Sequence, residues 1–167
     1  MRQSWRYRLG RVVMMLVAMV VVAACGITSK IPENEYLLSK VVIVPDKSVP
    51  IEERITEDKD GLTTYVRQTP NKRFLGINFY VWAYLQANPT KDNWWNNFLR
   101  KVGQVPVLLD STLIDRSIVN LETVLQQRGY FSSDVTCKID TTRRRRAHVT
   151  YVLHQGVPMR IDSIEYS

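Results

Sequence analysis

The strongest constraint on the fold is one amphipathic segment that is followed at once by two alternating segments. Residues 113–128 carry apolar side chains at i, i+4, i+7 and i+11, which lie on one face of an α-helix. These side chains are Ile114, Ile118, Leu121 and Leu125. We predict that Thr112 and Asp115 cap the start of this helix, that Gly129 ends it, and that Tyr130 packs back on the last turn.

The two alternating segments after this helix predict an antiparallel hairpin. Their apolar side chains recur at every second position, which places them on one face of a half-buried strand. In the first segment these residues are Val135, Cys137 and Ile139, and in the second Ala147, Val149, Tyr151 and Leu153. Thr141, Thr142 and the four arginines Arg143–Arg146 form the connecting turn. We interpret the arginines as a solvated hairpin end rather than a phosphate site.

The preceding residues predict one more strand and several short helices. We expect a strand over 37–44, a short helix over 62–67, and helical stripes over 74–85 and 95–102 that end at Pro89 and at Gly103. This order predicts an α+β fold in which helices cover one face of a three-stranded mixed sheet. The first strand reaches its partner through a helical crossover, and the second strand, around 133–139, is the more exposed edge.

The first 25 residues read as a targeting segment. Arginines over 2–11 precede 13 consecutive apolar residues, Val12–Ala24. A helix of that length rises about 20 Å, which is shorter than the roughly 30 Å hydrocarbon core of a bilayer. The segment therefore fits a secretory signal peptide, and its end, Val22-Ala23-Ala24-Cys25, resembles the bacterial lipobox. We predict that Cys25 is lipidated and that Gly26, which is not Asp, favours the outer membrane; the alternative is an ordinary signal peptide with an incidental cysteine.

Charge and side-chain chemistry exclude several functions. The chain has 23 basic and 16 acidic residues, but the four arginines before residue 25 account for more than half of the net charge of +7. Nucleic acid is therefore not an expected partner. His148 and His154 are about 20 Å apart along one strand, too far to share a metal ion. The carboxylate pairs at 52–53 and 57–58 fall in a polar loop, so we predict no enzyme, no cofactor and no metal. Cys137 is predicted to be a buried, inert thiol.

The order strand, helices, strand, strand resembles a POTRA domain of the BamA/TamA superfamily of outer-membrane assembly proteins. The junction Gln127-Arg128-Gly129-Tyr130-Phe131 carries part of this resemblance. The segments 31–38 (IPENEYLL) and 67–76 (RQTPNKRFLG) are similar to the lipidated TamA-like proteins, sometimes called TamL. The chain departs from that family because it lacks the β-barrel, so the resemblance implies an N-terminal fragment of a longer protein.

The domain organisation follows from these patterns. We predict a signal peptide over 1–24, a tether over 25–36, and a POTRA-like domain over 37–156 with a helical insertion near 74–103. Residues 157–167 are predicted to begin a second, truncated POTRA-like domain.

The resemblance implies a lipid-anchored binding module on the periplasmic face of the outer membrane. Such a module takes up extended segments of unfolded outer-membrane proteins, or of a TamB-type envelope-spanning protein, by adding a strand to its sheet. We assign the docking edge to Ser133, Asp134, Val135, Thr136, Cys137, Lys138 and Ile139. Proline at position 136 is expected to abolish the pairing. The alternative is a structural envelope lipoprotein with a POTRA-like fold and no part in barrel insertion.

A second candidate surface is rich in aromatic and cationic residues. Trp94, Trp95, Arg100 and Lys101 lie on one predicted helix, where they could meet a membrane interface. An 11-residue tether after Cys25 reaches at most about 38 Å, which allows such a contact. The alternative is that these rings fill a small core, and we expect that role for Trp82.

Overall fold

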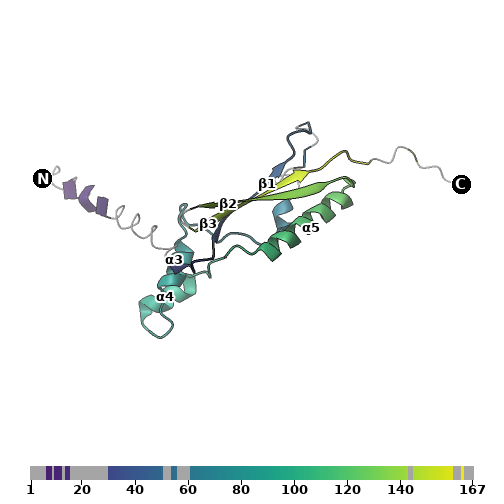
Figure 1. Ribbon diagram of the computed structural model, residues 1–167. Helices are drawn as coiled ribbons and strands as arrows, with labels where there is room; N and C mark the ends of the chain where they lie inside the picture. Colours follow the sequence, from purple (N-terminus) through teal and green to yellow (C-terminus); the bar gives the residue numbers. More distant parts are fainter. Residues whose placement is uncertain are drawn as a thin grey trace. The chain divides into compact units, whose positions relative to one another are not determined.

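The structure, a computed structural model, describes residues 7, 8, 10–12, 14, 15, 30–50, 54, 55, 61–142, 145–159 and 163. The chain divides into two compact units (Figure 1). Unit 1 consists of Met1–Glu35 and Asn71–Pro106, and unit 2 consists of Tyr36–Pro70 and Val107–Ser167. Among the described residues, no helix has the length and apolar character needed to cross a bilayer.

Unit 2 is built on a three-stranded mixed sheet, as predicted. Its strands are β1 (Leu37–Pro45), β2 (Asp134–Thr142) and β3 (Arg146–His154), in the spatial order β1-β3-β2. β1 runs parallel to the central strand β3, and β2 runs antiparallel to it. The hairpin and the crossover are therefore both confirmed, and β2 lies at an edge of the sheet.

The helix α5 (Ser111–Gln127) packs on one face of this sheet (Figure 1). Its apolar face joins side chains of all three strands and of the segments around residues 55 and 62–66 in one core. The fully buried members are Leu62, Leu121, Leu125 and Leu153, with Tyr151 and Val149 almost fully buried. The apolar side chains at helical spacing in the sequence correctly predicted this buried face, although Ile118 is only partly buried.

The two ends of α5 agree with the prediction to different extents. At the start, the cap is Asp110, whose carboxylate accepts hydrogen bonds from the N–H groups of Thr112 (2.8 Å) and Leu113 (3.4 Å). The prediction of a capping box that starts at Thr112 is therefore wrong, because the capping residue lies two positions earlier. At the other end, Tyr130 N–H donates to Leu125 O (3.0 Å) and Gly129 adopts a φ of 92°. This is the predicted Schellman stop.

One buried hydroxyl joins α5 to the segment that precedes it in unit 2. The segment expected to form a helix over 62–67 is a 3₁₀ turn, η3 (Leu62–Tyr65). Just beyond it, Arg67 N–H donates to Ser117 Oγ (2.9 Å), and Ser117 donates to Leu113 O (2.6 Å). Burial raises the pKa of the neighbouring Tyr151, although its hydrogen bond with Ser117 opposes the rise. Ser117 is fully buried, and its hydroxyl can lie inside the core only because these hydrogen bonds replace those with water.

Unit 1 contains the helices α3 (Phe79–Gln86) and α4 (Trp94–Val102). α3 begins five residues later than predicted because a tight turn precedes it. Phe74 and Ile77 exchange backbone hydrogen bonds of 2.9 Å across Leu75 and Gly76, which have φ angles of 48° and 77°. The apolar residues at 74 and 77 therefore belong to this turn and not to a helical stripe.

Candidate functional site

The two edges of the sheet in unit 2 are not equally open. The start of β1 is covered by residues 107–109, because Leu38 N–H donates to Val107 O and Leu109 N–H donates to Tyr36 O, both at 2.8 Å. Within the described part of the chain, no strand pairs with the outer side of β2 (Figure 1). The predicted docking edge is therefore the side of the sheet that is available for pairing.

A single side-chain contact reveals which backbone groups of β2 face outward. Val135 N–H donates to Glu122 Oε1 of α5 (3.2 Å), so this amide points away from β3. Successive residues of a strand alternate in direction, and paired residues of an antiparallel ladder alternate in the same way. The backbone groups of Cys137, Ile139 and Thr141 therefore face outward with those of Val135. Those of Thr136 face β3.

This assignment changes the predicted effect of proline at position 136. Thr136 lies opposite Val152 in the β2–β3 pairing, and its N–H points into that ladder. Proline there would break the sheet itself and would not act on the open edge. The sequence pattern predicts which side chains face the core, but it contains no information on which amides of an edge strand face solvent. Ile139 is the better position for the substitution.

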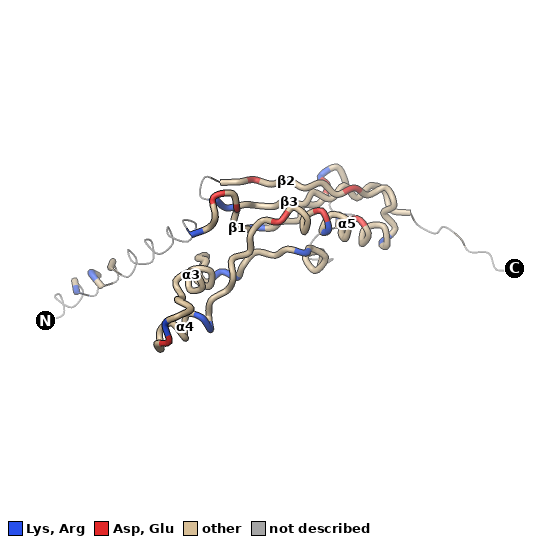
Figure 2. Tube along the Cα trace, turned by 60° about the horizontal axis from the view of Figure 1, so that its bottom comes forward, with Lys and Arg blue, Asp and Glu red and all other residues tan. Residues whose placement is uncertain are grey.

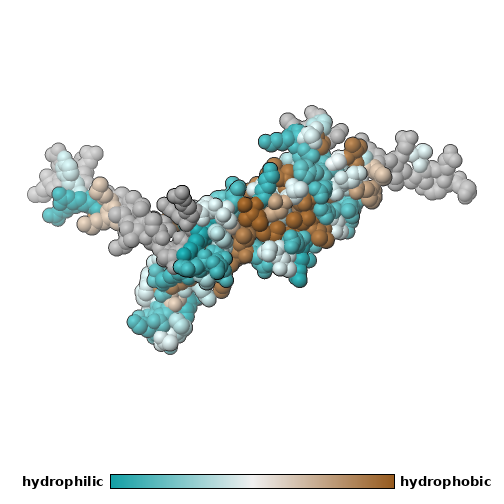
Figure 3. All heavy atoms as spheres, in the orientation of Figure 1, coloured by the Kyte–Doolittle hydropathy of each residue, from teal (hydrophilic) through white to brown (hydrophobic). Residues whose placement is uncertain are grey.

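An apolar strip accompanies the open edge. The inner face of β2 is buried at Val135, partly buried at Cys137 and 45% exposed at Ile139. α5 covers the start of β2 but not its far end, so Ile139, predicted to face inward, is exposed, and Cys137, predicted to be buried, is only partly buried. Ile118 of α5 is partly buried against the same core as Cys137, and Figure 3 shows hydrophobic residues gathered over the α5 and sheet region.

Cys137 has an environment that slows its chemistry. Partial burial raises the pKa of its thiol, and the negative charge of Asp115 adds to the rise. A raised pKa lowers the fraction of reactive thiolate at neutral pH. Burial and a carboxylate on α5 therefore both lower the reactivity of this thiol, and its inertness stays a prediction.

The opposite face of the sheet carries a short chain of polar groups. His154 Nε2 lies 3.2 Å from Thr136 Oγ1, and His154 Nδ1 lies 3.4 Å from Asp46 Oδ2. The Ser48 N–H bonded to Asp46 at 2.9 Å holds the pKa of that carboxyl below its ordinary value, and His154 adds to the effect. The array links the three strands, because Asp46 follows β1, Thr136 lies on β2 and His154 ends β3.

Several predicted residues lie outside the described part of the chain. These are the lipid attachment residue Cys25, the arginines Arg143 and Arg144, and the carboxylate pairs at 52–53 and 57–58. Arg145, which is described, has a φ of 51° in the hairpin turn. Over the described residues, no three His, Cys, Asp or Glu side chains are grouped closely enough to hold a metal ion.

The second candidate surface, on α4 of unit 1, is partly as predicted. Trp94 and Trp95 are exposed, and Phe98 of the same helix is exposed beside them. Trp82 is partly buried and stacks on Phe79 at 5.8 Å, in line with an internal role. Arg100 is engaged with its own loop, including an ion pair with Asp92 (3.0 Å).

The part of the chain that the structure describes is an α+β protein with the element order β1, η3, α3, α4, α5, β2 and β3. Among solved structures, the chain is similar to the crystal structure of Haemophilus influenzae BamA POTRA3-5, with a TM-score of 0.31 and 14% identity. The match covers 77% of this chain and 70% of that one. No protein-family model matches the sequence, and no curated protein matches it.

The contact between Glu122 and Val135 gives a first testable prediction. In Glu122→Ala, we expect the amide of Val135 to exchange its hydrogen at least about fivefold faster, since a hydrogen bond contributes about 1 kcal/mol. Glu122→Gln keeps an acceptor oxygen and serves as the control. Hydrogen exchange followed by NMR reads both variants. Unchanged exchange in Glu122→Ala would show that Val135 donates elsewhere, which would reverse the assignment of the outward groups.

Proposed function

We propose that this chain is a lipid-anchored, periplasmic POTRA-like module of an outer-membrane protein assembly or translocation factor, and that β2 binds extended segments by strand addition. The anchor would be an acylated Cys25 in the outer membrane. The bound segments would come from unfolded outer-membrane proteins or from a TamB-type envelope-spanning protein. The observation that supports the proposal is the open outer edge of β2.

The geometry of that edge fits an extended partner of variable sequence. Cys137, Ile139 and Thr141 each offer an N–H donor and a C=O acceptor on the outer side of β2. Backbone hydrogen bonds confer affinity with little dependence on sequence, and the exposed side chain of Ile139 favours segments with alternating apolar side chains. Strands of membrane barrels have this alternation. Polar Thr136, Lys138 and Asp140 on the other face limit unspecific aggregation of the edge.

Paired N-methylated peptides test this mode of binding. A synthetic peptide with the alternating pattern of a barrel strand is titrated into the full chain in detergent, and binding is followed by calorimetry. Two versions carry N-methyl groups on the odd or on the even residues. Because only every second residue of an added strand faces its partner, we expect one version to bind at least about tenfold more weakly, through the loss of two or more hydrogen bonds. Equal binding of the two versions would exclude strand addition.

The protein side of the same test uses two substitutions at one position. Ile139→Pro removes an outward N–H, and Ile139→Ala removes the same side chain but keeps the N–H. Edge strands tolerate proline where the N–H faces solvent, so the sheet should remain folded. We expect only the proline variant to lose peptide binding.

The anchor is tested separately by the mass of the N-terminal peptide, for which an unmodified Cys25 would be the contradicting result.

A further inference from the structure

After residue 24, the excess positive charge of the chain and half of all its aromatic residues lie in one segment of unit 1. Residues 71–106 contain eight aromatic side chains, five basic residues and one acidic residue, Asp92. The rest of the chain after residue 24 has 14 basic and 15 acidic residues, so its charges nearly cancel. Figure 2 shows this segment around α3 and α4. A surface that is both cationic and aromatic complements an anionic phospholipid bilayer.

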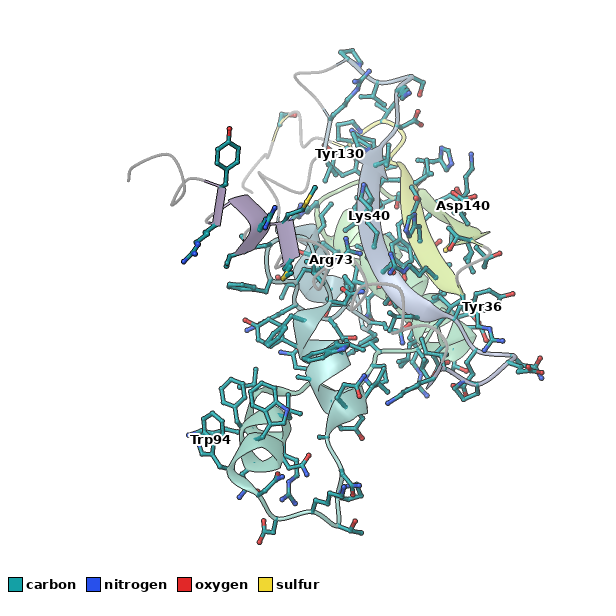
Figure 4. The ribbon with its side chains drawn as sticks, turned by 90° about the vertical axis from the view of Figure 1, so that its left-hand side faces the viewer. Tyr36, Lys40, Arg73, Trp94, Tyr130 and Asp140 are labelled. Atoms are coloured by element: carbon teal, nitrogen blue, oxygen red, sulfur yellow. The ribbon has the colours of Figure 1, made fainter. Side chains whose placement is uncertain are left out.

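The helix α4 presents its aromatic side to solvent. Trp94, Trp95 and Phe98 are 77%, 49% and 41% exposed. Their rings form one cluster, with centroid distances of 5.9 Å between the tryptophans and 5.8 Å between Trp95 and Phe98. Trp94 extends outward from α4 in Figure 4. A helix in a globular protein normally turns such rings inward, whereas here the buried residues are Asn96 and Leu99.

The cations around this aromatic cluster, Trp94, Trp95 and Phe98, have different roles. Lys101 follows Trp94 by seven residues, which places it on the same face of α4. Arg100 lies on another face, where it binds Asp92, Asn97 (2.6 Å) and the carbonyl of Lys91 (3.2 Å). Arg100 therefore holds the loop before α4, and Lys101 is the cation of α4 that accompanies the rings.

The N-terminal segment is attached to this same unit. Lys30 Nζ donates to Leu85 O at the end of α3 (2.8 Å), and Ile31 is buried. Lys30 is five residues from Cys25, a distance of at most about 18 Å in an extended chain. An acyl anchor on Cys25 would hold unit 1 within that distance of the bilayer surface.

We infer that the aromatic cluster of α4 lies in the headgroup region of an anionic phospholipid bilayer, with Lys101 against the lipid phosphates. The inference rests on the proposed anchoring at Cys25 and assigns a second lipid contact to the same module. α4 has nine residues and lies in the interface without crossing it. Together the anchor and the cluster would give the module two lipid contacts.

The chain's four tryptophans allow a local test. The variant Trp5→Phe/Trp82→Phe leaves Trp94 and Trp95 as the only tryptophans, and Trp94→Phe/Trp95→Phe is the matched control. The full chain is reconstituted in phosphatidylethanolamine vesicles with or without phosphatidylglycerol. Quenching of tryptophan emission by lipids brominated close to the headgroup then reports the depth of the rings.

We expect at least about twofold quenching of Trp94 and Trp95 in vesicles with phosphatidylglycerol, and less in high salt, because salt screens the attraction to phosphate. Lys101→Glu should reduce the quenching, and Lys47→Glu, a charge reversal in unit 2, should not. Emission of Trp94 and Trp95 that stays accessible to acrylamide in every vesicle would overturn the inference. The mass of the Cys25 peptide shows independently whether the anchor is present.

Discussion

We expect Leu121→Ala to lower the free energy of unfolding of unit 2 by about 2–5 kcal/mol. Leu121 is fully buried in the core that α5 forms with the sheet. Truncation to alanine removes the transfer free energy of its methyl and methylene groups and leaves a cavity. Neighbours such as Tyr151, itself almost fully buried, have little room to close it.

Urea unfolding followed by far-ultraviolet circular dichroism measures this loss. Val119→Ala is the matched control because Val119 lies on the same helix and is 59% exposed. Its substitution should change the free energy of unfolding by no more than about 0.5 kcal/mol. Similar effects of the two substitutions would contradict the assignment of the buried face of α5.

Gly103→Ala should destabilise unit 1, although glycine to alanine usually stabilises a site with an ordinary φ. Gly103 has a φ of −63°, which any residue can adopt, and at such positions alanine adds about 0.4–1 kcal/mol of stability. A Cβ at Gly103, however, would lie 2.8 Å from the backbone N and Cα of Tyr84 and from Leu99 O. Backbone atoms cannot rotate away, so we expect a loss of about 1–3 kcal/mol as α3 and α4 separate.

Tryptophan fluorescence measures this effect locally, because Trp82, Trp94 and Trp95 all lie in residues 71–106 and unit 2 has no tryptophan. Val105→Ala, at an exposed position two residues further on, should leave the urea midpoint unchanged. A Gly103→Ala variant that unfolds at higher urea concentration than the parent would show that the two helices do not pack at this glycine.

The sheet and its helix could be predicted from the sequence because both depend on periodic burial. The stripe of α5, the Gly129 stop and the alternation in β3 each reflect a single dominant force, the removal of apolar side chains from water. The order β1-β3-β2 arises because the adjacent strands β2 and β3 form a hairpin and β1 then pairs with β3 through a crossover connection.

Local polar chemistry was harder to predict. Asp110 caps α5 in place of Thr112, since several polar residues precede the helix and only the backbone geometry selects one. Phe74 and Ile77 have helical spacing but form a turn at Gly76. In both places the sequence offers two local structures of similar free energy, and contacts with residues further along the chain decide between them.

For the candidate site too, features that depend on periodic burial could be predicted, and individual polar contacts could not. The sequence placed the open edge on β2, but Glu122, which fixes the direction of the Val135 amide, has no signature in the sequence because it is one of several polar residues on α5. The exposure of Trp94 and Trp95 was also undecided, since aromatic residues at helical spacing fit a core as well as a surface.

Hydrogen exchange along β2 with and without bound peptide tests the central claim most directly. We expect saturating peptide to slow exchange at Cys137, Ile139 and Thr141, and to change Thr136 and Lys138 little, because their amides already face β3. Slowed exchange at every second residue of this strand would be the signature of an added strand. Peptide binding that protects α5 or β1 instead, or that protects β2 without this alternation, would contradict the account.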